Sequence, residues 1–249
     1  MVLSLENWPI LEIIRMLGLL GIGLTTSYLV QKEKLKVNYS RKILHFAQLL
    51  SIFVINKTFF NYSIEYFAIS GALSLVESLI MVEPLRRRSR FIAFMFLSYD
   101  RPEDRPHTVR LVATQVLGMT VVLIGVAYLY QFSGLPLDLL AIPLIITAFG
   151  DGLAEPVGVY FGKHKYKAKD LFGDRVYTRS YEGSSMVFFS SIGALIFFSK
   201  LFLLNELICL FLLVPLLMTL TEAFSPHTWD NPFMYLVGGL AVYLIVIVY

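Results

Sequence analysis

The stretch Leu207–Ser225, LICLFLLVPLLMTLTEAFS, is apolar apart from Glu222 and a few serine and threonine residues. It is about as long as a helix must be to cross the hydrocarbon core of a bilayer. The whole chain has a similar character, because its 249 residues are 57% hydrophobic and only 16% charged. Soluble domains are closer to about 45–50% apolar and about 25% charged, so a soluble enzyme or a disordered chain is excluded. We predict an integral membrane protein with a single polytopic membrane domain, residues 1–249.

Apolar runs of similar length recur along the chain and predict an all-α fold, a bundle of about eight transmembrane helices. The second run is short, and Arg15 interrupts the first. Phe91–Tyr99 is apolar but too short to cross a bilayer, so we expect it in the interface. The predicted spans are Ile10–Val30, Ile43–Asn56, Tyr62–Val82, Val109–Tyr130, Leu135–Gly162, Ser184–Leu204, Leu207–Ser225 and Pro232–Tyr249.

Basic residues predict how the chain is oriented in the membrane. All of its 21 Lys and Arg residues except Arg15, Lys57 and Lys200 lie in or beside three segments between spans. These segments fall on one side if eight spans alternate. By the positive-inside rule that side is the cytoplasm, which places both termini outside, and the plasma (inner) membrane is the expected host. The predicted cytoplasmic loops are about 31–42, 83–108, 163–183 and 226–231.

Several acidic residues occur inside or at the edge of the predicted spans. A charge at the centre of a bilayer costs at least about 2.5–3.5 kcal/mol, so a few of them facing lipid would cancel the net stability of a domain. We therefore expect them to face the interior of the bundle, water or a cation. These acids are Glu65, Glu77, Asp138, Asp151, Glu155 and Glu222.

The segment Gly150-Asp151-Gly152 interrupts one apolar run, and Pro156 follows it. Glycine and proline together predict a helix broken at Gly150-Asp151-Gly152, which membranes tolerate where the backbone lines a cavity or is covered by protein. On a continuous helix, Asp151 and Glu155 would share one face because they are four residues apart. The alternative is that Asp151 only caps the second half of the helix.

The next loop combines basic and acidic side chains. Lys163–Lys169 has a lysine at every second position, and Asp170–Asp174 adds acids. Basic side chains hold phosphate oxygens, whereas acids approach phosphate through a bridging divalent metal, so the mixture indicates polyphosphate chemistry. Ser184 and the free N–H groups at the start of the next span would cap a helix pointed at a phosphate. Alternatively, the lysines only set topology or contact anionic headgroups, which explains the charge but not the acids.

Four pieces of sequence form the most specific pattern in the chain. The longest reads Gly150-Asp151-Gly152-x-Ala154-Glu155-x-x-Gly158-x-x-x-Gly162-Lys163, and the second reads Arg179-Ser180-x-Glu182-Gly183-Ser184. Arg41-Lys42-x-x-His45 opens the second span, and Glu222 is followed by Asp230-Asn231. Together they resemble the signature of polyprenol kinases, which include phytol, farnesol and dolichol kinases and the CTP-dependent diacylglycerol kinase of yeasts. The short chain is closer to phytol and farnesol kinases than to the longer dolichol kinases.

The resemblance implies a kinase that uses CTP as phosphate donor and Mg²⁺ as cofactor. Phosphoryl transfer depends mainly on positioning and electrostatics, so we expect acids around the metal and basic or N–H groups around the phosphates. The expected metal ligands are Asp151, Glu155, Glu222, Asp230 and Asn231. The expected nucleotide-binding residues are Arg41, Lys42, Lys163, Lys165, Arg179, Ser180, Gly183 and Ser184. The expected catalytic residues are Asp151 or His45 as the base, and Glu182, which orients the loop or binds a second metal.

The expected partners are a lipid alcohol from the bilayer and a nucleoside triphosphate from the cytoplasm. No nucleic-acid partner is expected, and a homo-oligomer stays open. Two departures from the family pattern leave the choice of alcohol open. Glu155 stands where phytol kinases usually carry Asp, and Arg101–His107 matches no part of the pattern.

Other functions stay open as well. CDP-diacylglycerol synthase has a similar central run and also uses CTP and a divalent metal. Its usual C-terminal signature is absent here, where Thr221-Glu222 and Asp230-Asn231 stand instead, and we therefore favour a kinase. Diacylglycerol is an alternative acceptor for such a kinase. A cation-coupled transporter would also combine intramembrane acids with a broken helix, but carriers usually have paired halves and a site near the midplane.

Overall fold

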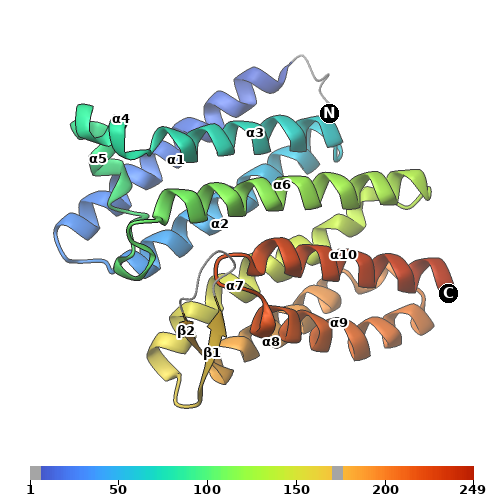
Figure 1. The fold of residues 1–249 in the computed structure, drawn as a ribbon. Coiled ribbons are helices and arrows are strands. Elements are labelled where there is room, and N and C mark those ends of the chain that lie inside the picture. The colour runs from blue at the N-terminus through green and yellow to red at the C-terminus, as the bar shows by residue number, and fades with distance from the viewer. Residues whose placement is uncertain (1–6, 170–175) are drawn as a thin grey trace. The chain divides into compact units, whose positions relative to one another are not determined.

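The computed structural model describes residues 7–169 and 176–249, and these residues are mainly helical. Contacts within the chain divide it into two compact units, Met1–Thr120 and Val121–Tyr249. Helix α6 (Thr108–Phe132) crosses the boundary between them. Figure 1 shows that long helices dominate both units.

Unit 1 is built around α1, which packs against α2 and α5. Helix α5 (Arg90–Phe96) covers most of the apolar run Phe91–Tyr99 and is too short to cross a bilayer, as the sequence predicts. The elements of this unit before α6 are α1 (Trp8–Gln31), α2 (Val37–Ile55), the π-helical turn η2 (Asn56–Phe60), α3 (Ile64–Ile80), α4 (Glu83–Arg88), α5 (Arg90–Phe96) and the 3₁₀ turn η3 (Pro102–Asp104).

Unit 2 packs α7 against α8, and α10 against both α7 and α9. Buried apolar side chains such as Leu195, Leu210 and Met218 form its core. Two strands pair into an antiparallel hairpin between α7 and α8. The elements after α6 are η4 (Leu137–Leu140), α7 (Ala141–Phe161), β1 (Lys165–Lys169), β2 (Val176–Ser180), α8 (Tyr181–Phe197), η5 (Ser199–Leu201), α9 (Leu204–Phe224) and α10 (Asp230–Val248).

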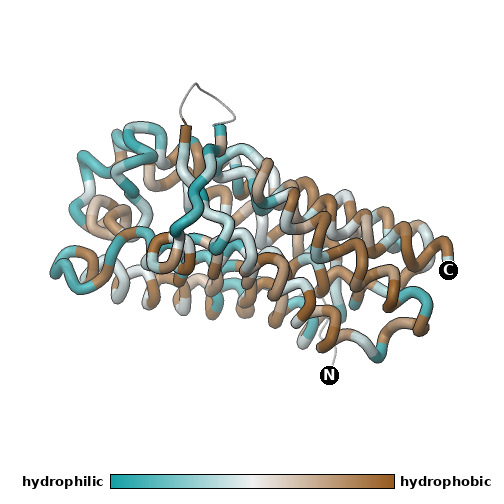
Figure 2. The backbone as a smooth tube through the Cα atoms, turned by 90° about the horizontal axis from the view of Figure 1, so that it is seen from below, coloured by the Kyte–Doolittle hydropathy of each residue, from teal (hydrophilic) through white to brown (hydrophobic). Residues whose placement is uncertain are grey.

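Among the described residues, six helical segments are long and apolar enough to cross a membrane. They support the prediction of a helical, multi-pass membrane protein, and Figure 2 shows hydrophobic residues along most of the length of these helices. Helices α3 and α8 match two further predicted spans but have only 17 residues each, so a count of eight crossings is not confirmed. The six segments are Trp8–Gln31, Val37–Phe60, Thr108–Phe132, Leu137–Phe161, Leu204–Phe224 and Asp230–Val248.

Helix α7 is continuous, so the predicted break at Gly150-Asp151-Gly152 is wrong. A glycine inside a helix costs only about 1 kcal/mol relative to alanine, and close packing against a neighbouring helix offsets that cost. A Cβ atom on Gly150 would lie 3.2 Å from the Cα of Val187, and one on Gly158 would lie 2.9 Å from the Oγ of Ser180. The small residues therefore allow α7 to approach α8 and β2 without ending the helix.

The β-hairpin is a departure from the predicted all-α fold. Lys165 pairs with Ser180 and Lys169 pairs with Val176 at its two ends. Side chains alternate along both strands, so that Tyr166 and Arg179 lie on the less exposed face. This alternation with a period of two is the ordinary signal of a strand, so the predicted basic loop is in part a β-hairpin. The predicted loop acids Asp170 and Asp174 lie outside the described residues.

Candidate functional site

Arg179 on β2 joins the hairpin to two helices of unit 2. Its Nη2 atom lies 3.1 Å from Oδ2 of Asp230 in the first turn of α10, and Nη1 lies 3.5 Å from Oε1 of Glu222 near the end of α9. Nη1 also donates a hydrogen bond to the main-chain oxygen of Glu222. The exposed fractions of these side chains are only 11% for Arg179, 6% for Glu222 and 13% for Asp230. The forked guanidinium group can contact two carboxylates at once, which a lysine cannot do in the same geometry.

Asp151 approaches the same place from α7. It is buried, and it lies close enough to Arg179 and Glu222 for its charge to act on both. Asp151, Glu222 and Asp230, which are expected metal ligands, thus lie around Arg179. This arginine is an expected nucleotide-binding residue. We refer to Asp151, Arg179, Glu222 and Asp230 as the acid–arginine cluster.

The environment of the hairpin shifts two pKa values near this cluster. Burial disfavours the charge on Arg179, but the carboxylates of Asp230 and Glu222 favour it, and the pKa of Arg179 rises above its ordinary value. Tyr166 is the cross-strand partner of Arg179. Burial, followed by the charge of Glu222, raises the pKa of Tyr166 to about 12. Arg179 is therefore charged and Tyr166 neutral at physiological pH.

Ser180 caps helix α8, whereas the sequence predicts this role for Ser184. The main-chain N–H of Gly183 donates to Oγ of Ser180 at 3.1 Å. A capping side chain must precede the first turn, and α8 begins at Tyr181, so Ser184 lies too far along the helix. Its Oγ instead donates to the main-chain oxygen of Ser180 and lies 2.6 Å from the hydroxyl of Tyr166. Ser184 thus fixes the less exposed face of the hairpin to α8.

Glu182 holds the segment that leads into the hairpin. Its Oε1 atom lies 2.8 Å from Nδ1 of His164. The main-chain N–H of His164 also donates to the carboxylate, at 3.2 and 3.3 Å to its two oxygens. These contacts fit the expected role in which Glu182 orients the loop.

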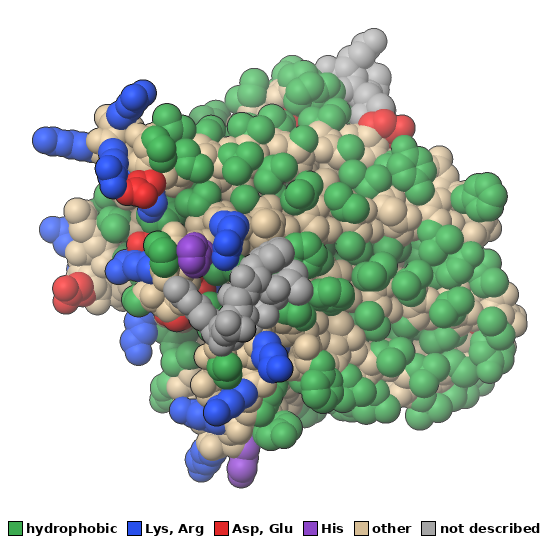
Figure 3. Space-filling view, in the orientation of Figure 1, with side chains coloured by type: hydrophobic (Ala, Val, Ile, Leu, Met, Phe, Trp, Pro, Cys, Tyr) green, Lys and Arg blue, Asp and Glu red, His purple; other side chains and the backbone are tan. Residues whose placement is uncertain are grey.

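The lysines that the sequence analysis assigns to phosphate binding lie on the outside of unit 2. Lys163 precedes the hairpin, and Lys165 lies on the exposed face of β1, opposite the face that carries Tyr166. Figure 3 shows Lys and Arg side chains gathered near the ends of the helices, whereas hydrophobic side chains cover the helix sides. Lys163 and Lys165 are therefore not part of the acid–arginine cluster.

Arg41, Lys42 and His45 belong to unit 1 and lie in the first half of α2. Nη1 of Arg41 lies 2.5 Å from Oδ2 of Asp104, and Nε of Arg101 donates to the same oxygen at 2.9 Å. Asp104 is fully buried. The segment that contains Arg101 and Asp104, to which the family pattern gives no role, thus builds an ion-paired turn against α2. The alternation of acidic and basic residues in this segment is the signal that would have indicated such pairing.

A second buried ion pair in unit 1 was missed at the sequence level. Glu12 and Arg15 share one face of α1, and Nη2 of Arg15 lies 2.7 Å from Oε2 of Glu12. Ser70 on α3 donates to Oε1 of Glu12 at 2.5 Å. Arg15 therefore enters the first span together with its counter-ion. The three-residue spacing of the two residues on a predicted helix is the signal that could have revealed the pair.

Two of the acids placed in spans lie at helix starts instead. Glu65 is in the first turn of α3, where its Oε2 accepts a hydrogen bond from Ser63. Asp138 is in the 3₁₀ turn that precedes α7. The positive end of the helix dipole stabilises a carboxylate in such positions. These acids thus avoid the cost that the sequence analysis attributed to them.

The oxygen atoms of the acid–arginine cluster decide whether it suits the predicted Mg²⁺ site. Within residues 7–169 and 176–249, no three His, Cys, Asp or Glu side chains form a group that could hold a metal alone. Mg²⁺ usually needs only one or two carboxylates, because substrate phosphates supply other ligands. Oε2 of Glu222 is buried and has no hydrogen-bond partner in the described part of the chain. Glu222 together with Asp151 therefore fits a site of this kind.

The other expected metal ligands have different surroundings. Glu155 is half-buried, one turn beyond Asp151 on α7. Oδ1 of Asp230 accepts the main-chain N–H of Asn231 at 3.0 Å, and its other oxygen faces Arg179. Asp230 is thus engaged by the protein itself, and a metal role for Glu155, Asp230 and Asn231 stays a prediction.

Comparison of the chain with protein-family models, curated proteins and solved structures gives no match. The resemblance to polyprenol kinases therefore rests on the motifs quoted from the sequence. To those motifs the structure adds that their charged residues on α7, β2, α9 and α10 meet in one cluster.

Proposed function

We propose that the chain is a membrane lipid kinase that transfers the terminal phosphate of a nucleoside triphosphate to an isoprenoid alcohol such as phytol, farnesol or geranylgeraniol. CTP is the proposed donor, on the strength of the family resemblance. The observation that carries the proposal is the contact of Arg179 with Glu222 and Asp230, beside Asp151. Removing these charges from water is expensive, so the meeting of three acids and an arginine at one place favours a functional role.

The position of the cluster suits two substrates of opposite solubility. Glu222 lies near the end of α9 and Asp230 in the first turn of α10, so these two acids lie at the ends of membrane helices, whereas Asp151 lies midway along α7. An isoprenoid chain stays in lipid and presents its hydroxyl group near the surface, whereas a triphosphate stays in water. Both can meet only at such helix ends. We propose that this end faces the cytoplasm of the plasma (inner) membrane, as the distribution of basic residues predicts.

The proposed reaction is a direct phosphoryl transfer. The bond between the terminal phosphorus and its bridging oxygen breaks, a bond from the alcohol oxygen to that phosphorus forms, and the nucleoside diphosphate leaves. The proton of the alcohol passes to a base, for which Asp151 is the candidate in unit 2. A loose transition state demands little strength of this base.

The residues of unit 2 have separate proposed roles. Arg179 is held in place by two carboxylates, and its proposed role is to donate hydrogen bonds to phosphate oxygens. Asp151 and Glu222 would hold Mg²⁺, which when bound offsets further negative charge on the phosphates. Ser180 and Glu182 keep the hairpin and the start of α8 in place.

A phosphatidate cytidylyltransferase is the main competing function, since it would also require CTP and a divalent metal. A cation-coupled carrier is less favoured, because α7 is continuous and the broken helix that suggested a carrier is absent. A third alternative is a diacylglycerol kinase, in which diacylglycerol is the phosphate acceptor in place of the isoprenoid alcohol.

A substrate panel distinguishes these functions. Purified protein is incubated with Mg²⁺ and CTP or ATP labelled in the terminal phosphate, together with phytol, farnesol, geranylgeraniol or diacylglycerol. Label in an isoprenoid phosphate is the expected result, and label in phosphatidate identifies a diacylglycerol kinase. CTP labelled in the first phosphate, supplied with phosphatidate, gives a labelled CDP-lipid only for a cytidylyltransferase. Absence of any labelled lipid overturns the enzymatic proposal.

Asp151→Asn tests the cluster itself. The variant keeps the size of the side chain but removes the charge, so we expect at least about a hundredfold loss of kcat with an unchanged Tm. Asp138→Asn is the matched control, because Asp138 lies in the 3₁₀ turn before α7, at the opposite end of that helix from the hairpin. Full activity of Asp151→Asn would remove Asp151 from the site.

A further inference from the structure

The exposed face of the hairpin is strongly basic. Lys165, Lys167 and Lys169 occupy alternate positions of β1 and are all exposed. Neither an ion pair nor a hydrogen bond of their side chains occurs within the described part of the chain. The other face of the same strand carries Tyr166 and the buried Ala168. The three lysines therefore form a row of positive charge that the described residues of unit 2 do not neutralise. We call this row the lysine face.

Main-chain hydrogen bonds attach both ends of strand β1 to residues at the ends of helices in unit 2. At one end the main-chain N–H of Tyr181, the first residue of α8, donates to the oxygen of His164 at 3.0 Å. At the other end the N–H of His227, between α9 and α10, donates to the oxygen of Lys169 at 2.9 Å. The His227 ring also stacks on Tyr177, with 3.5 Å between ring centroids. The hairpin is therefore attached to helix ends of unit 2 at two places, and Figure 1 shows its strands running across the direction of these helices.

Exposed aromatic side chains mark the level at which these helices end. The exposed fractions are 77% for Tyr160 and 60% for Phe161 in the last turn of α7, and 65% for Tyr181 in the first turn of α8. Aromatic residues are enriched where membrane helices meet the headgroup region. The start of β1 follows α7 by only a few residues, so the lysine face begins within about 10–14 Å of this level.

We propose that the lysine face binds the headgroups of anionic phospholipids in the adjoining leaflet. The charges are complementary, and the attraction of a basic residue to an anionic membrane acts within about one Debye length, roughly 8–10 Å. A hairpin that is attached to the helix ends and runs across the direction of these helices keeps all three lysines near that range. Free nucleotide is the less suitable occupant, because the lysines point away from the acid–arginine cluster. This surface is separate from the proposed function and exists whether or not the chain is a kinase.

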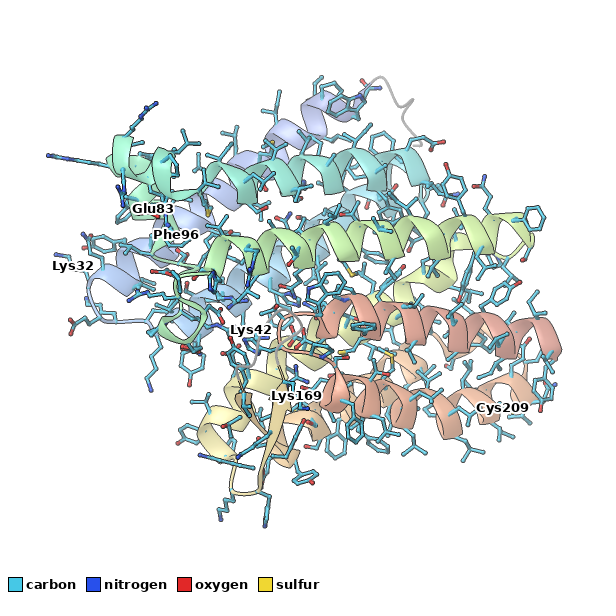
Figure 4. All side chains as sticks on the ribbon, viewed as in Figure 1. Lys32, Lys42, Glu83, Phe96, Lys169 and Cys209 are labelled. Atoms are coloured by element: carbon cyan, nitrogen blue, oxygen red, sulfur yellow. The ribbon has the colours of Figure 1, made fainter. Side chains whose placement is uncertain are left out.

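A fluorescent reporter on the hairpin tests the proposal. Thr178 is exposed on β2 and pairs with Lys167, so a probe at this position reports on the lysine face. The single Cys209 is replaced by serine, and Thr178→Cys is labelled with a polarity-sensitive fluorophore in the full-length protein. Figure 4 shows Cys209 on α9, away from Lys169 on the hairpin. Spectra are compared in vesicles of phosphatidylcholine alone and of phosphatidylcholine with about one third phosphatidylglycerol.

The expected result is a blue-shifted, stronger emission in the anionic vesicles, which about 0.5 M salt reverses. Each lysine contributes about fivefold to binding near an anionic surface. We therefore expect the ratio of membrane-bound to free hairpins to fall about a hundredfold in the triple variant Lys165→Gln/Lys167→Gln/Lys169→Gln. Arg87→Gln/Arg88→Gln/Arg90→Gln is the control. It removes the same number of charges from exposed positions in unit 1 and leaves the shift unchanged.

Three outcomes overturn the proposal. The first is an identical spectrum in both kinds of vesicle. The second is an equal loss of the shift in both triple variants, which would indicate a general effect of net charge. The third is a response to CTP or inorganic phosphate in neutral vesicles without a response to anionic lipid, which would assign the lysine face to a soluble phosphate.

Discussion

Oδ2 of Asp230 lies 3.1 Å from Nη2 of Arg179, which connects the first turn of α10 to the second strand of the hairpin. The same guanidinium reaches Glu222 on α9. The two acids outnumber the arginine, so this part of the cluster carries a net negative charge when both are ionised. Because the groups are largely shielded from water, losing one partner leaves a buried charge, which is more costly than losing an exposed pair.

Replacement of Arg179 should affect both stability and activity. Arg179→Gln leaves Glu222 and Asp230 without their cation, and breaking a buried pair in this way costs about 3–5 kcal/mol. Arg179→Lys keeps the charge but cannot contact both acids in the same geometry, so we expect an intermediate loss. Thermal unfolding in detergent measures the first effect, and the kinase assay with labelled CTP measures the second.

Lys167→Gln is the matched control for Arg179→Gln, because it removes one charge from the exposed face of the hairpin. It should change Tm by less than the uncertainty of the measurement. A Tm of Arg179→Gln equal to that of Lys167→Gln would show that the contacts of Arg179 do not hold the hairpin.

The close approach of α7 and α8 predicts opposite effects for two glycines on α8. A Cβ atom on Gly183 would lie 2.6 Å from the main-chain oxygen of Ala154, whereas one on Gly193 would meet nothing within 4 Å. Gly183→Ala should therefore destabilise the fold by about 1–3 kcal/mol. Gly193→Ala should stabilise it by up to about 1 kcal/mol, because alanine has the higher helix propensity. Equal Tm values for the two variants would contradict the packing of α7 on α8.

The Glu12–Arg15 pair predicts that one substitution is worse than two. Arg15→Leu leaves the buried carboxylate of Glu12 without its cation, so we expect a loss of about 3–5 kcal/mol. Glu12→Leu/Arg15→Leu removes both charges and should recover most of that loss, since apolar residues replace a buried pair at little cost. Unfolding of both variants in the same detergent measures the difference. A double variant no more stable than Arg15→Leu would argue against the pair.

Tyr166 predicts a loss of stability in alkaline solution. Its pKa is about 12 in the folded chain, against about 10 for an ordinary tyrosine. Because the pKa is raised, neutral Tyr166 contributes to the free energy of unfolding, and this contribution is complete below about pH 10. It is lost as the pH rises through about 12. Tyr166→Phe should therefore lose less stability than the parent between these values.

Absorbance of tyrosinate supplies the direct measurement for Tyr166. The difference between the parent and Tyr166→Phe titrations should correspond to one tyrosine that ionises near pH 12. Tyr181→Phe is the control, because Tyr181 is exposed. A difference curve for Tyr166 centred near pH 10 would show that the residue is not buried beside Glu222.

The membrane class and the approximate limits of the helices could be predicted from the sequence. Both depend on the length of apolar runs, which is a local property of the chain. The prediction failed where local signals were ambiguous. Gly150-Asp151-Gly152 is a pattern typical of a helix break. In the structure, Val187 of α8, which lies further along the chain, occupies the space that a side chain at Gly150 would need. The hairpin was missed because its alternating lysines also read as a basic loop.

In the candidate site, too, the sequence predicts which residues matter but not which of them are in contact. The sequence by itself identified Asp151 and Glu222 as acids whose charge needs an explanation, since an intramembrane charge is costly in any fold. Arg179 and Asp230 were singled out by the resemblance to polyprenol kinases. Only the tertiary structure decided that Arg179 lies between Glu222 and Asp230. The reason is that these contacts join residues 43 and 51 positions apart, and no local pattern specifies which buried acid a given arginine will neutralise.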